Sequence, residues 1–306
     1  MSKINSKEMD SYEVIIIGGS YAGLSAAMAL GRSLRNVLLI DAGEPCNRQT
    51  PHSHNFLTQD GETPAMISAK AKAQVLAYPT VKCHEGLAIK AEQITAGFAV
   101  STIDGQRFEA RKLILAMGIK DIFPNIKGFA ECWGISVLHC PYCHGYEVAR
   151  QPLGVIANGD MAFEFVRMIY NWSTALTLFT NGLPALNDEQ AEYFKRKDIQ
   201  IVTDEIAEIV HQDGFLKHLL LKNGNKHPLK AVFGRGGLEQ HSSLAAELGC
   251  EIDQQNLIVV NGVQTTVPGV FAAGDCTTLF RTVSGAVANG NLAGISASKE
   301  LIAADF

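Results

Sequence analysis

Short, wholly apolar runs alternate with mixed segments in the first part of the chain. Residues 14–17 (Val-Ile-Ile-Ile) and 37–40 (Val-Leu-Leu-Ile) contain no polar side chain. Runs of this length predict strands buried on both faces, as in a parallel sheet. The stretch between them, 18–31, begins with glycine and becomes rich in alanine and leucine. We therefore expect a strand, a tight turn, a helix and a second strand, which together make one βαβ unit.

A similar alternation returns in the middle of the chain. An apolar run at 153–156 leads through Asn158-Gly159-Asp160 into a helical pattern at 161–170. Further strands are expected at 176–179 and 199–202. The pattern predicts an α/β protein with two Rossmann-like nucleotide-binding domains.

The pattern changes again after residue 237. Apolar runs at 257–260 and 270–273 predict two more strands, and the long stretch 283–302, rich in alanine and glycine, predicts a helix. Earlier strands are expected near 98–103 and 113–115.

Charge and hydropathy narrow the class of protein. The 306 residues carry 26 Lys and Arg against 31 Asp and Glu, a net charge of -5. Mild acidity without a basic run argues against nucleic acid or an anionic membrane as a partner. Apolar runs are all shorter than the roughly 18 residues that a membrane span needs. Residues 1–13 are polar, without the apolar core of a secretory signal. We expect a cytoplasmic enzyme.

The turn at 18–23 has the pattern of a dinucleotide-binding loop. Gly18 permits a tight turn out of the strand, Gly23 lets the helix pack close to the sheet, and Ser20 between them is small. The helix that follows points free N–H groups at a bound pyrophosphate. Asp41 ends the next strand, where a carboxylate binds ribose hydroxyls. A plain tight turn is the alternative. The expected binding residues here are Gly18, Gly19, Ser20, Tyr21, Ala22, Gly23 and Asp41.

Cys140 and Cys143 are spaced for joint chemistry. Two intervening residues allow an intramolecular disulfide, in which one thiolate attacks a substrate sulfur and the other resolves the mixed disulfide. Structural zinc is an alternative, but the sequence offers no second Cys pair at such spacing. A second alternative is that Cys140 and Cys143 are two inert buried thiols. The five other cysteines are scattered, and we expect them to be buried thiols: Cys46, Cys83, Cys132, Cys250 and Cys276.

The order of these motifs resembles one family. The dinucleotide loop, Ala-Met-Gly at 116–118, Cys-Pro-Tyr-Cys at 140–143 and Val-Phe-Ala-Ala-Gly-Asp at 270–275 follow one another as in the pyridine-nucleotide disulfide oxidoreductases. The resemblance is to the low-molecular-weight thioredoxin reductases and covers nearly the whole chain from Val14 onward. It implies FAD as cofactor.

The resemblance also implies site residues and a domain plan. Asp275 would bind the ribityl chain or pyrophosphate, residues 280–283 would border the flavin ring, and Asn55 would contact the flavin. The further cofactor-binding residues expected by this resemblance are Ala116, Gly118, Gly274, Arg281, Thr282 and Val283. A discontinuous FAD-binding domain of residues 1–118 and 237–306 is implied, with 119–236 inserted to carry the dithiol. A homodimer is implied as well.

The same resemblance assigns roles around the dithiol. Cys143 would lie against the flavin as the charge-transfer thiolate, and Cys140 would be the interchange thiol that faces the substrate. Thioredoxin reductases usually have Asp after the second Cys as acid/base, but His144 stands here. Histidine titrates near neutrality and shuttles thiol protons. His139 is a second candidate for this role.

The chain departs from the reductases at the expected NADPH site. Ala157 stands where the turn usually needs Gly, although Gly159 and Ala162 remain. The reductases follow the next strand with a His-Arg-Arg that holds the 2′-phosphate, whereas residues 180–183 here are Thr-Asn-Gly-Leu. Without cationic partners, a phosphate loses its charge-assisted hydrogen bonds. We therefore treat NADPH as doubtful.

Two variants of the family fit better. The segments 54–61 and His-Cys-Pro-Tyr-Cys-His-Gly-Tyr-Glu at 139–147 resemble the FAD-dependent dithiol oxidases and the reductase-like flavoproteins that do not use NADPH. The expected partner is a dithiol or disulfide, either a small molecule or a thioredoxin-like protein. An NADPH-dependent thioredoxin reductase and a flavin-containing redox sensor without turnover are the alternatives.

Overall fold

The computed structural model describes residues 11–306, which form two compact units. One unit contains the chain up to Arg48 together with Ala65–Lys120 and Leu238–Phe306. The other contains Gln49–Pro64 and Asp121–Gly237. We call them unit 1 and unit 2. The expectations that residues 1–10 lack a signal and begin the first domain lie outside the described residues.

Unit 1 is built on a sheet whose central strands are parallel. Its main path runs β17-β18-β19-β6-β1-β2-β3, with β4 and β5 joined to β6 as an antiparallel extension. The strands β19, β6 and β1 are apolar and buried near their carboxyl ends, and β2 is apolar and buried up to Ile40, as expected for a covered parallel sheet. The strands are β1 (Ser11–Ile17), β2 (Val37–Asp41), β3 (Val81–Glu85), β4 (Ala88–Ile94), β5 (Gly97–Thr102), β6 (Arg107–Leu115), β17 (Val260–Asn261), β18 (Gln264–Thr265) and β19 (Val270–Ala272).

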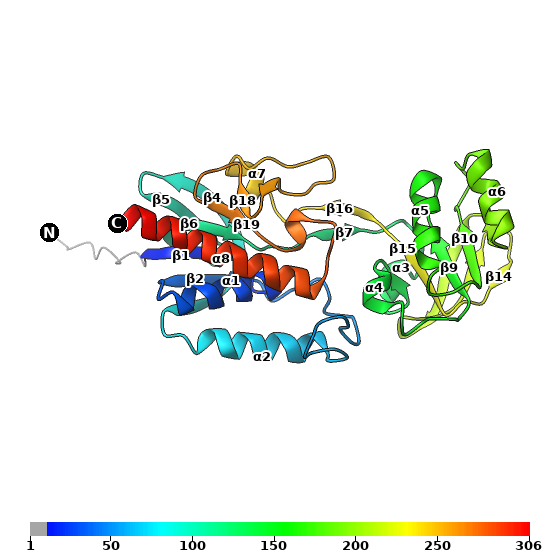
Figure 1. Cartoon of the computed structure of the whole chain (residues 1–306), viewed down its shortest axis with the longest axis horizontal. Helices are drawn as coiled ribbons and strands as arrows, with labels where there is room; N and C mark the ends of the chain where they lie inside the picture. Colours follow the sequence, from blue (N-terminus) through cyan, green and yellow to red (C-terminus); the bar gives the residue numbers. More distant parts are fainter. Residues whose placement is uncertain (1–10) are drawn as a thin grey trace. The chain divides into compact units, whose positions relative to one another are not determined.

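Two helices pack side by side on this sheet. Figure 1 shows the C-terminal α8 (Val283–Asp305, red) along α1 (Tyr21–Arg32, blue). Glycine permits their close approach, because a Cβ at Gly290 would overlap the carbonyl oxygen of Ala22. The unit's other helices are α2 (Pro64–Leu76), α7 (Leu244–Glu247) and the short 3-10 turn η1 (Asp275–Thr277).

Unit 2 holds a second parallel sheet in the order β11-β10-β9-β15-β8. An antiparallel sheet of β12, β13 and β14 packs nearby through a shared apolar cluster. The strands are β8 (Val137–Leu138), β9 (Leu153–Ile156), β10 (Leu176–Phe179), β11 (Gln200–Val202), β12 (Ile206–Gln212), β13 (Phe215–Leu221), β14 (Lys226–His227) and β15 (Ala231–Gly234). The helices are α3 (Phe129–Cys132), α4 (Pro141–His144), α5 (Gly159–Ile169) and α6 (Asp188–Arg196). A separate two-stranded sheet pairs β7 (Lys120–Ile122) with β16 (Gly237–Glu239).

The α/β fold with two Rossmann-like halves is confirmed, and three details differ from the sequence prediction. Of the five cysteines expected to be buried, Cys46 is exposed and Cys83 is half-buried, whereas the other three are buried. Residues 257–260 were expected to form a strand, but only Val260 belongs to one, and Ile258 makes an isolated bridge to Ile252. The apolar side chains there are buried as a loop against the core.

The segment Gln49–Pro64 groups with unit 2, whereas the sequence placed it in the first domain. The amide of Gln49 donates to the carbonyl oxygens of Trp133 and Ala130, and those bonds lie within unit 2.

Candidate active site

The residues predicted to bind FAD in unit 1 gather at one edge of its sheet. Ile17 is in register with Ile40 and with Leu115, and Leu115 is in register with Ala272. The residues that follow these four therefore form a row at the carboxyl ends of adjacent strands. Gly18, Asp41, Ala116 and Gly274 lie in or next to this row, where ligands of open α/β sheets bind.

The turn after β1 depends on glycine. Gly18 has φ +105°, a conformation that side-chain-bearing residues rarely adopt, and a Cβ there would overlap the carbonyl oxygen of Ala116. A Cβ at Gly23 would overlap the carbonyl oxygen of Gly18. The loop is therefore drawn tightly against the sheet, which leaves its outer face to a ligand.

The N-terminus of α1 keeps its backbone donors available. Ser20 is the N-cap residue, yet its side chain makes no capping hydrogen bond. Tyr21 and Ala22 follow in the first turn, and burial raises the pKa of the Tyr21 phenol, whose oxygen accepts a hydrogen bond from Asn47 Nδ2 at 3.3 Å. Free N–H groups and the positive end of the helix dipole suit a pyrophosphate. These residues fit the predicted FAD.

The other predicted FAD residues lie at the start of α8 and beside it. Gly274 has φ +84°, and a Cβ there would lie 2.9 Å from that of Ala22. Asp275 Oδ2 contacts Arg281 Nε at 3.3 Å. Thr282 caps α8 by accepting the N–H of Gly285 at 3.0 Å, so Val283 is the first helical residue. Gly118, with φ +69°, has open space where a Cβ would stand.

The dithiol lies at the corresponding edge of unit 2. The register aligns Phe179, Ile156 and Gly234, and Leu138 lies beside Phe233. Because β8 is parallel to its neighbour, His139 and Cys140 leave the sheet at its carboxyl edge. Cys140 is the N-cap residue of the short helix α4, and it is joined to Cys143 by a disulfide with 5.3 Å between the Cα atoms.

The two histidines next to the dithiol have different surroundings. His139 stacks its ring on Trp133, with centroids 5.3 Å apart, as part of an aromatic cluster. His144 lies one helical turn from Cys140, with its backbone N–H donating to the Cys140 carbonyl oxygen at 3.2 Å. Burial lowers the pKa of His144, the charge of Glu147 raises it, and the charge of His54 lowers it. A neutral imidazole is therefore favoured beside the dithiol, as a base requires.

The turn between β9 and α5 does not fit a pyridine nucleotide. Asn158 Oδ1 accepts the N–H of Gly159 at 2.9 Å and that of Ala185 at 2.8 Å, and its Nδ2 donates to the Leu183 carbonyl oxygen at 2.9 Å. The loop after β10 is thus tied over the helix N-terminus that a pyrophosphate would need. Ala157, which stands at the expected glycine position of the turn, does not have a positive φ. The residue with a positive φ in this turn is Gly159, at +64°.

Charge opposes a phosphate at the same place. The first turn of α5 carries Asp160, whose Oδ1 accepts a hydrogen bond from Gln190 Nε2 at 2.9 Å. Residues 180–187 include no Lys or Arg. Arg235, which follows β15, places its guanidinium over the Phe165 ring, 4.9 Å from the centroid.

Comparison with known proteins places this geometry in a family. The family model described as pyridine nucleotide-disulphide oxidoreductase matches residues 12–290. The chain belongs to the pyridine nucleotide-disulphide oxidoreductases. "Thioredoxin reductase tcpT" of Claviceps purpurea is 33% identical over 95% of this chain and 94% of its own. A thioredoxin reductase of Listeria monocytogenes is 26% identical over 96% and 95%. An oxidoreductase structure from Agrobacterium tumefaciens has a TM-score of 0.90 at 39% identity, over 95% of this chain and 99% of that one.

Family membership confirms the resemblance inferred from the sequence. The protein is an FAD-dependent disulfide oxidoreductase of the thioredoxin reductase type. Within this pyridine nucleotide-disulphide oxidoreductase, the residues predicted for FAD, except Asn55, lie in unit 1, and the dithiol residues lie in unit 2. Asn55 also belongs to unit 2, where its N–H donates to Asp60 Oδ1 at 2.7 Å.

Sequence reasoning missed two residues near the dithiol. Glu147 and His54 both act electrostatically on His144. Glu147 was discoverable, since it stands only three residues after His144 in the sequence. The contact of His54 with Glu147 joins segments that are far apart in the sequence, and no pattern near either residue predicts it.

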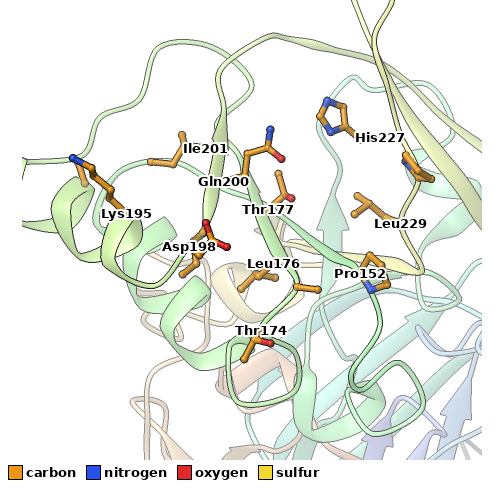
Figure 2. Close-up of a pocket in the computed structure, with 14 residues that line it drawn as sticks. Pro152, Thr174, Leu176, Thr177, Lys195, Asp198, Gln200, Ile201, His227 and Leu229 are labelled. Atoms are coloured by element: carbon orange, nitrogen blue, oxygen red, sulfur yellow. The ribbon is translucent and has the colours of Figure 1, made fainter.

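A cavity of about 780 Å³ lies elsewhere in unit 2 (Figure 2). Pro152, Thr174 and Gln200 mark its walls at the amino ends of β9, β10 and β11. Ligands of parallel sheets bind at the opposite, carboxyl edge, where the dithiol lies. We therefore do not assign the catalytic centre to this cavity.

Within residues 11–306, no cluster of three or more His, Cys, Asp or Glu side chains is arranged to hold a metal ion. The helices of this same range include none that is long and apolar enough to cross a membrane. The homodimer and the cytoplasmic location stay predictions.

Proposed function

We propose that this protein oxidises dithiols to disulfides at Cys140 and Cys143 and passes the electrons through FAD to an acceptor, with NADPH taking no part. The observation that best supports this proposal is the set of hydrogen bonds by which the Asn158 side chain holds the loop after β10 against the N-terminus of α5. It contrasts with the start of α1, where the Ser20 side chain makes no capping bond. One nucleotide site is open to a phosphate, and the other is filled by the protein's own groups.

The chemistry at the dithiol follows from the two cysteines and His144. A substrate thiol gives its proton to the His144 imidazole, and the resulting thiolate attacks Cys140, the interchange residue. A substrate–Cys140 disulfide forms, the Cys140–Cys143 bond breaks, and Cys143 leaves as the thiolate. The second substrate thiolate then attacks the mixed disulfide and releases Cys140. The substrate leaves as a disulfide, and the enzyme holds a dithiol.

Bound FAD supplies the oxidant, since it accepts two electrons and two protons from the enzyme dithiol and so restores the disulfide. Molecular oxygen is the acceptor that we propose for the electrons. The net reaction converts a substrate dithiol and O₂ into a substrate disulfide and hydrogen peroxide. Gly18, Gly19, Asp41 and Asp275 are proposed to hold the cofactor.

An anaerobic titration tests this function. Purified holoprotein is mixed in parallel with NADPH, NADH and dithiothreitol, and the flavin absorbance is followed. We expect fast bleaching by the dithiol and slow or absent bleaching by either nucleotide. Hydrogen peroxide should appear when air is readmitted. Stoichiometric bleaching by low micromolar NADPH would contradict the proposal.

An NADPH-dependent thioredoxin reductase is the second candidate. The names of the Claviceps and Listeria relatives favour it. It predicts the opposite outcome of the same titration, together with NADPH-driven reduction of a thioredoxin disulfide. A redox sensor without turnover, the third alternative, predicts that no dithiol is oxidised repeatedly.

A further inference from the structure

The segment Gln49–Pro64 forms a closed loop against the dithiol unit. The N–H of Ser53 donates to the Glu62 carbonyl oxygen at 2.8 Å, and the N–H of Gly61 returns a bond to the Ser53 carbonyl oxygen at 2.9 Å. These two bonds hold the ends of the loop together, so that the residues between them have a fixed path. His54 therefore occupies a defined position in unit 2.

Both ring nitrogens of His54 face carboxylates. Nε2 lies 3.5 Å from Glu147 Oε1, and Nδ1 lies 3.8 Å from Asp60 Oδ1. The exposed side-chain fraction rises from 22% at His54 to 41% at Glu147 and 69% at Asp60. An imidazole between two carboxylates that reach water has a donor or acceptor on each side. A small side-chain movement would bring either pair within hydrogen-bond distance.

Glu147 connects this group to the dithiol. Glu147 lies three residues after His144, in the turn that follows α4, and its charge acts on the His144 imidazole. The charged groups that act on His144 are Glu147, from its own segment, and His54, from the loop. Asp60 acts on His54 from its other side.

We propose that Glu147 and His54 are positioning residues that carry protons between His144 and solvent during thiol–disulfide exchange. This inference rests on the proposed function and deepens it. The proton that His144 takes from a substrate thiol moves to Glu147, and His54 passes it toward Asp60 and water. No electrons move in these transfers, and every carrier returns to its starting protonation state before the next thiol reacts.

Charge substitutions test the relay by the pKa of His144. Glu147→Gln removes a negative neighbour and should lower the pKa of His144 further. His54→Gln removes a group that is positive when protonated and should raise it. NMR titration of imidazole-labelled oxidised protein, with His144→Gln to assign the signal, measures both shifts. A purely structural role would not give shifts of opposite sign, so shifts of one sign or no shift would overturn the proposal.

Kinetics provide the second measurement. We expect each substitution to slow single-turnover reduction of the Cys140–Cys143 disulfide by dithiothreitol by about 5- to 10-fold at the optimal pH. The double variant should be little slower than either single variant, because both act in one path. Glu147→Asp should recover part of the rate. Additive losses in the double variant would count against the relay.

His52→Gln is the matched control. His52 lies in the same segment and contacts the Gly61 carbonyl oxygen through Nδ1 at 2.9 Å, with its ring centroid 6.4 Å from that of His54. It should change neither the rate nor the pKa of His144, and an equal effect would overturn the proposal. If the wild-type protein oxidises no dithiol, the proposed function fails instead. Normal wild-type turnover with unaffected Glu147→Gln and His54→Gln variants would reject the relay alone.

Discussion

The backbone N–H of Gly19 donates a hydrogen bond to Asp41 Oδ1 at 3.1 Å, and the N–H of Gly43 donates to the same oxygen at 3.2 Å. The carboxylate that we propose for the cofactor is thereby held in place by the turn that we propose for the pyrophosphate. One acceptor oxygen is engaged by the backbone, and the carboxylate keeps further acceptor capacity for ribose hydroxyls.

Gly19→Ala should therefore weaken FAD binding. A Cβ at this position would overlap Asp41 Cγ, so the carboxylate must move. Losing one charge-assisted hydrogen bond costs about 1.5–3 kcal/mol, or roughly 10- to 100-fold in affinity. Flavin fluorescence during reconstitution of apoprotein measures the dissociation constant. Gly237→Ala is the control, because φ is not positive at either glycine and a Cβ at Gly237 would meet only the Ile122 side chain at 3.6 Å, an ordinary contact. Equal FAD affinity in Gly19→Ala would contradict the assignment.

The two cysteines should respond differently to substitution. Cys140→Ser is expected to leave a Cys143 thiolate that gives long-wavelength charge-transfer absorbance with bound FAD, whereas Cys143→Ser should not. Both should abolish dithiol turnover, since neither retains a disulfide. Visible spectra and oxygen consumption test this. Cys83→Ser, at a half-buried thiol of unit 1, should keep turnover. Turnover that survives in Cys140→Ser or Cys143→Ser would disprove the site.

The pH dependence of dithiol oxidation should reflect the lowered pKa of His144. Burial lowers the pKa of His144 below its ordinary 6.5. Because a base must be neutral to accept a proton, activity should persist at pH values where a free histidine is already protonated. The acid limb of kcat/KM for dithiol oxidation should lie below pH 6.5 and disappear in His144→Gln. A limb above pH 6.5 would reject this assignment.

Asn158→Ala should lower stability without affecting the dithiol reaction. The side chain makes three hydrogen bonds within 2.9 Å that join the α5 N-terminus to the loop after β10. Losing an N-cap and the loop anchor should reduce the free energy of unfolding by about 1–3 kcal/mol. Urea unfolding gives this value, and oxygen consumption with dithiothreitol should be unchanged. Asn223→Ala, in a surface turn, is the control. Wild-type stability in Asn158→Ala would show that the loop is held by other contacts.

Gly290→Ala should separate two helices. A Cβ there would overlap the carbonyl oxygen of Ala22, which belongs to the first turn of α1. Overpacking of this kind costs about 1–3 kcal/mol. Thermal unfolding should show the loss, and FAD affinity should fall with it, because the start of α1 is the proposed pyrophosphate site. Ala288→Gly provides a comparison at a neighbouring position of α8. Unchanged FAD affinity together with lower stability would place the pyrophosphate elsewhere.

Apolar runs and glycine turns carried most of the fold prediction. The buried strands at 14–17 and 37–40 were predictable because only a covered parallel sheet accepts such runs. The row formed by Gly18, Asp41 and Ala116 follows, since parallel strands end at one edge. The Cys-Pro-Tyr-Cys segment likewise predicts a redox-active disulfide from its spacing alone. In these cases, the decisive information lies within a few neighbouring residues.

The remaining features depend on long-range contacts. Asn158 looks like an ordinary turn residue, and its bonds to Leu183 and Ala185 exist only once the next loop folds back. The contact of His54 with Glu147 similarly joins distant segments. The strand expected at 257–260 failed because burial alone does not supply a pairing partner. Sequence patterns report on residues that are close along the chain. The Asn158 bonds, the His54–Glu147 contact and the pairing of 257–260 depend on residues that are close only in the folded structure.

The assignment of Gln49–Pro64 to unit 2 has a consequence for biosynthesis. The ribosome releases this segment long before Ala130 and Glu147, its partners, have been made. The segment lacks its folding partners until Asp121–Gly237 has emerged from the ribosome, and the dithiol unit is complete only at that point. Unit 1 is completed later, because its elements β19 and α8 come after Gly237 in the sequence. The dithiol unit should therefore finish folding first during translation, and the cofactor unit should close only after α8 has emerged.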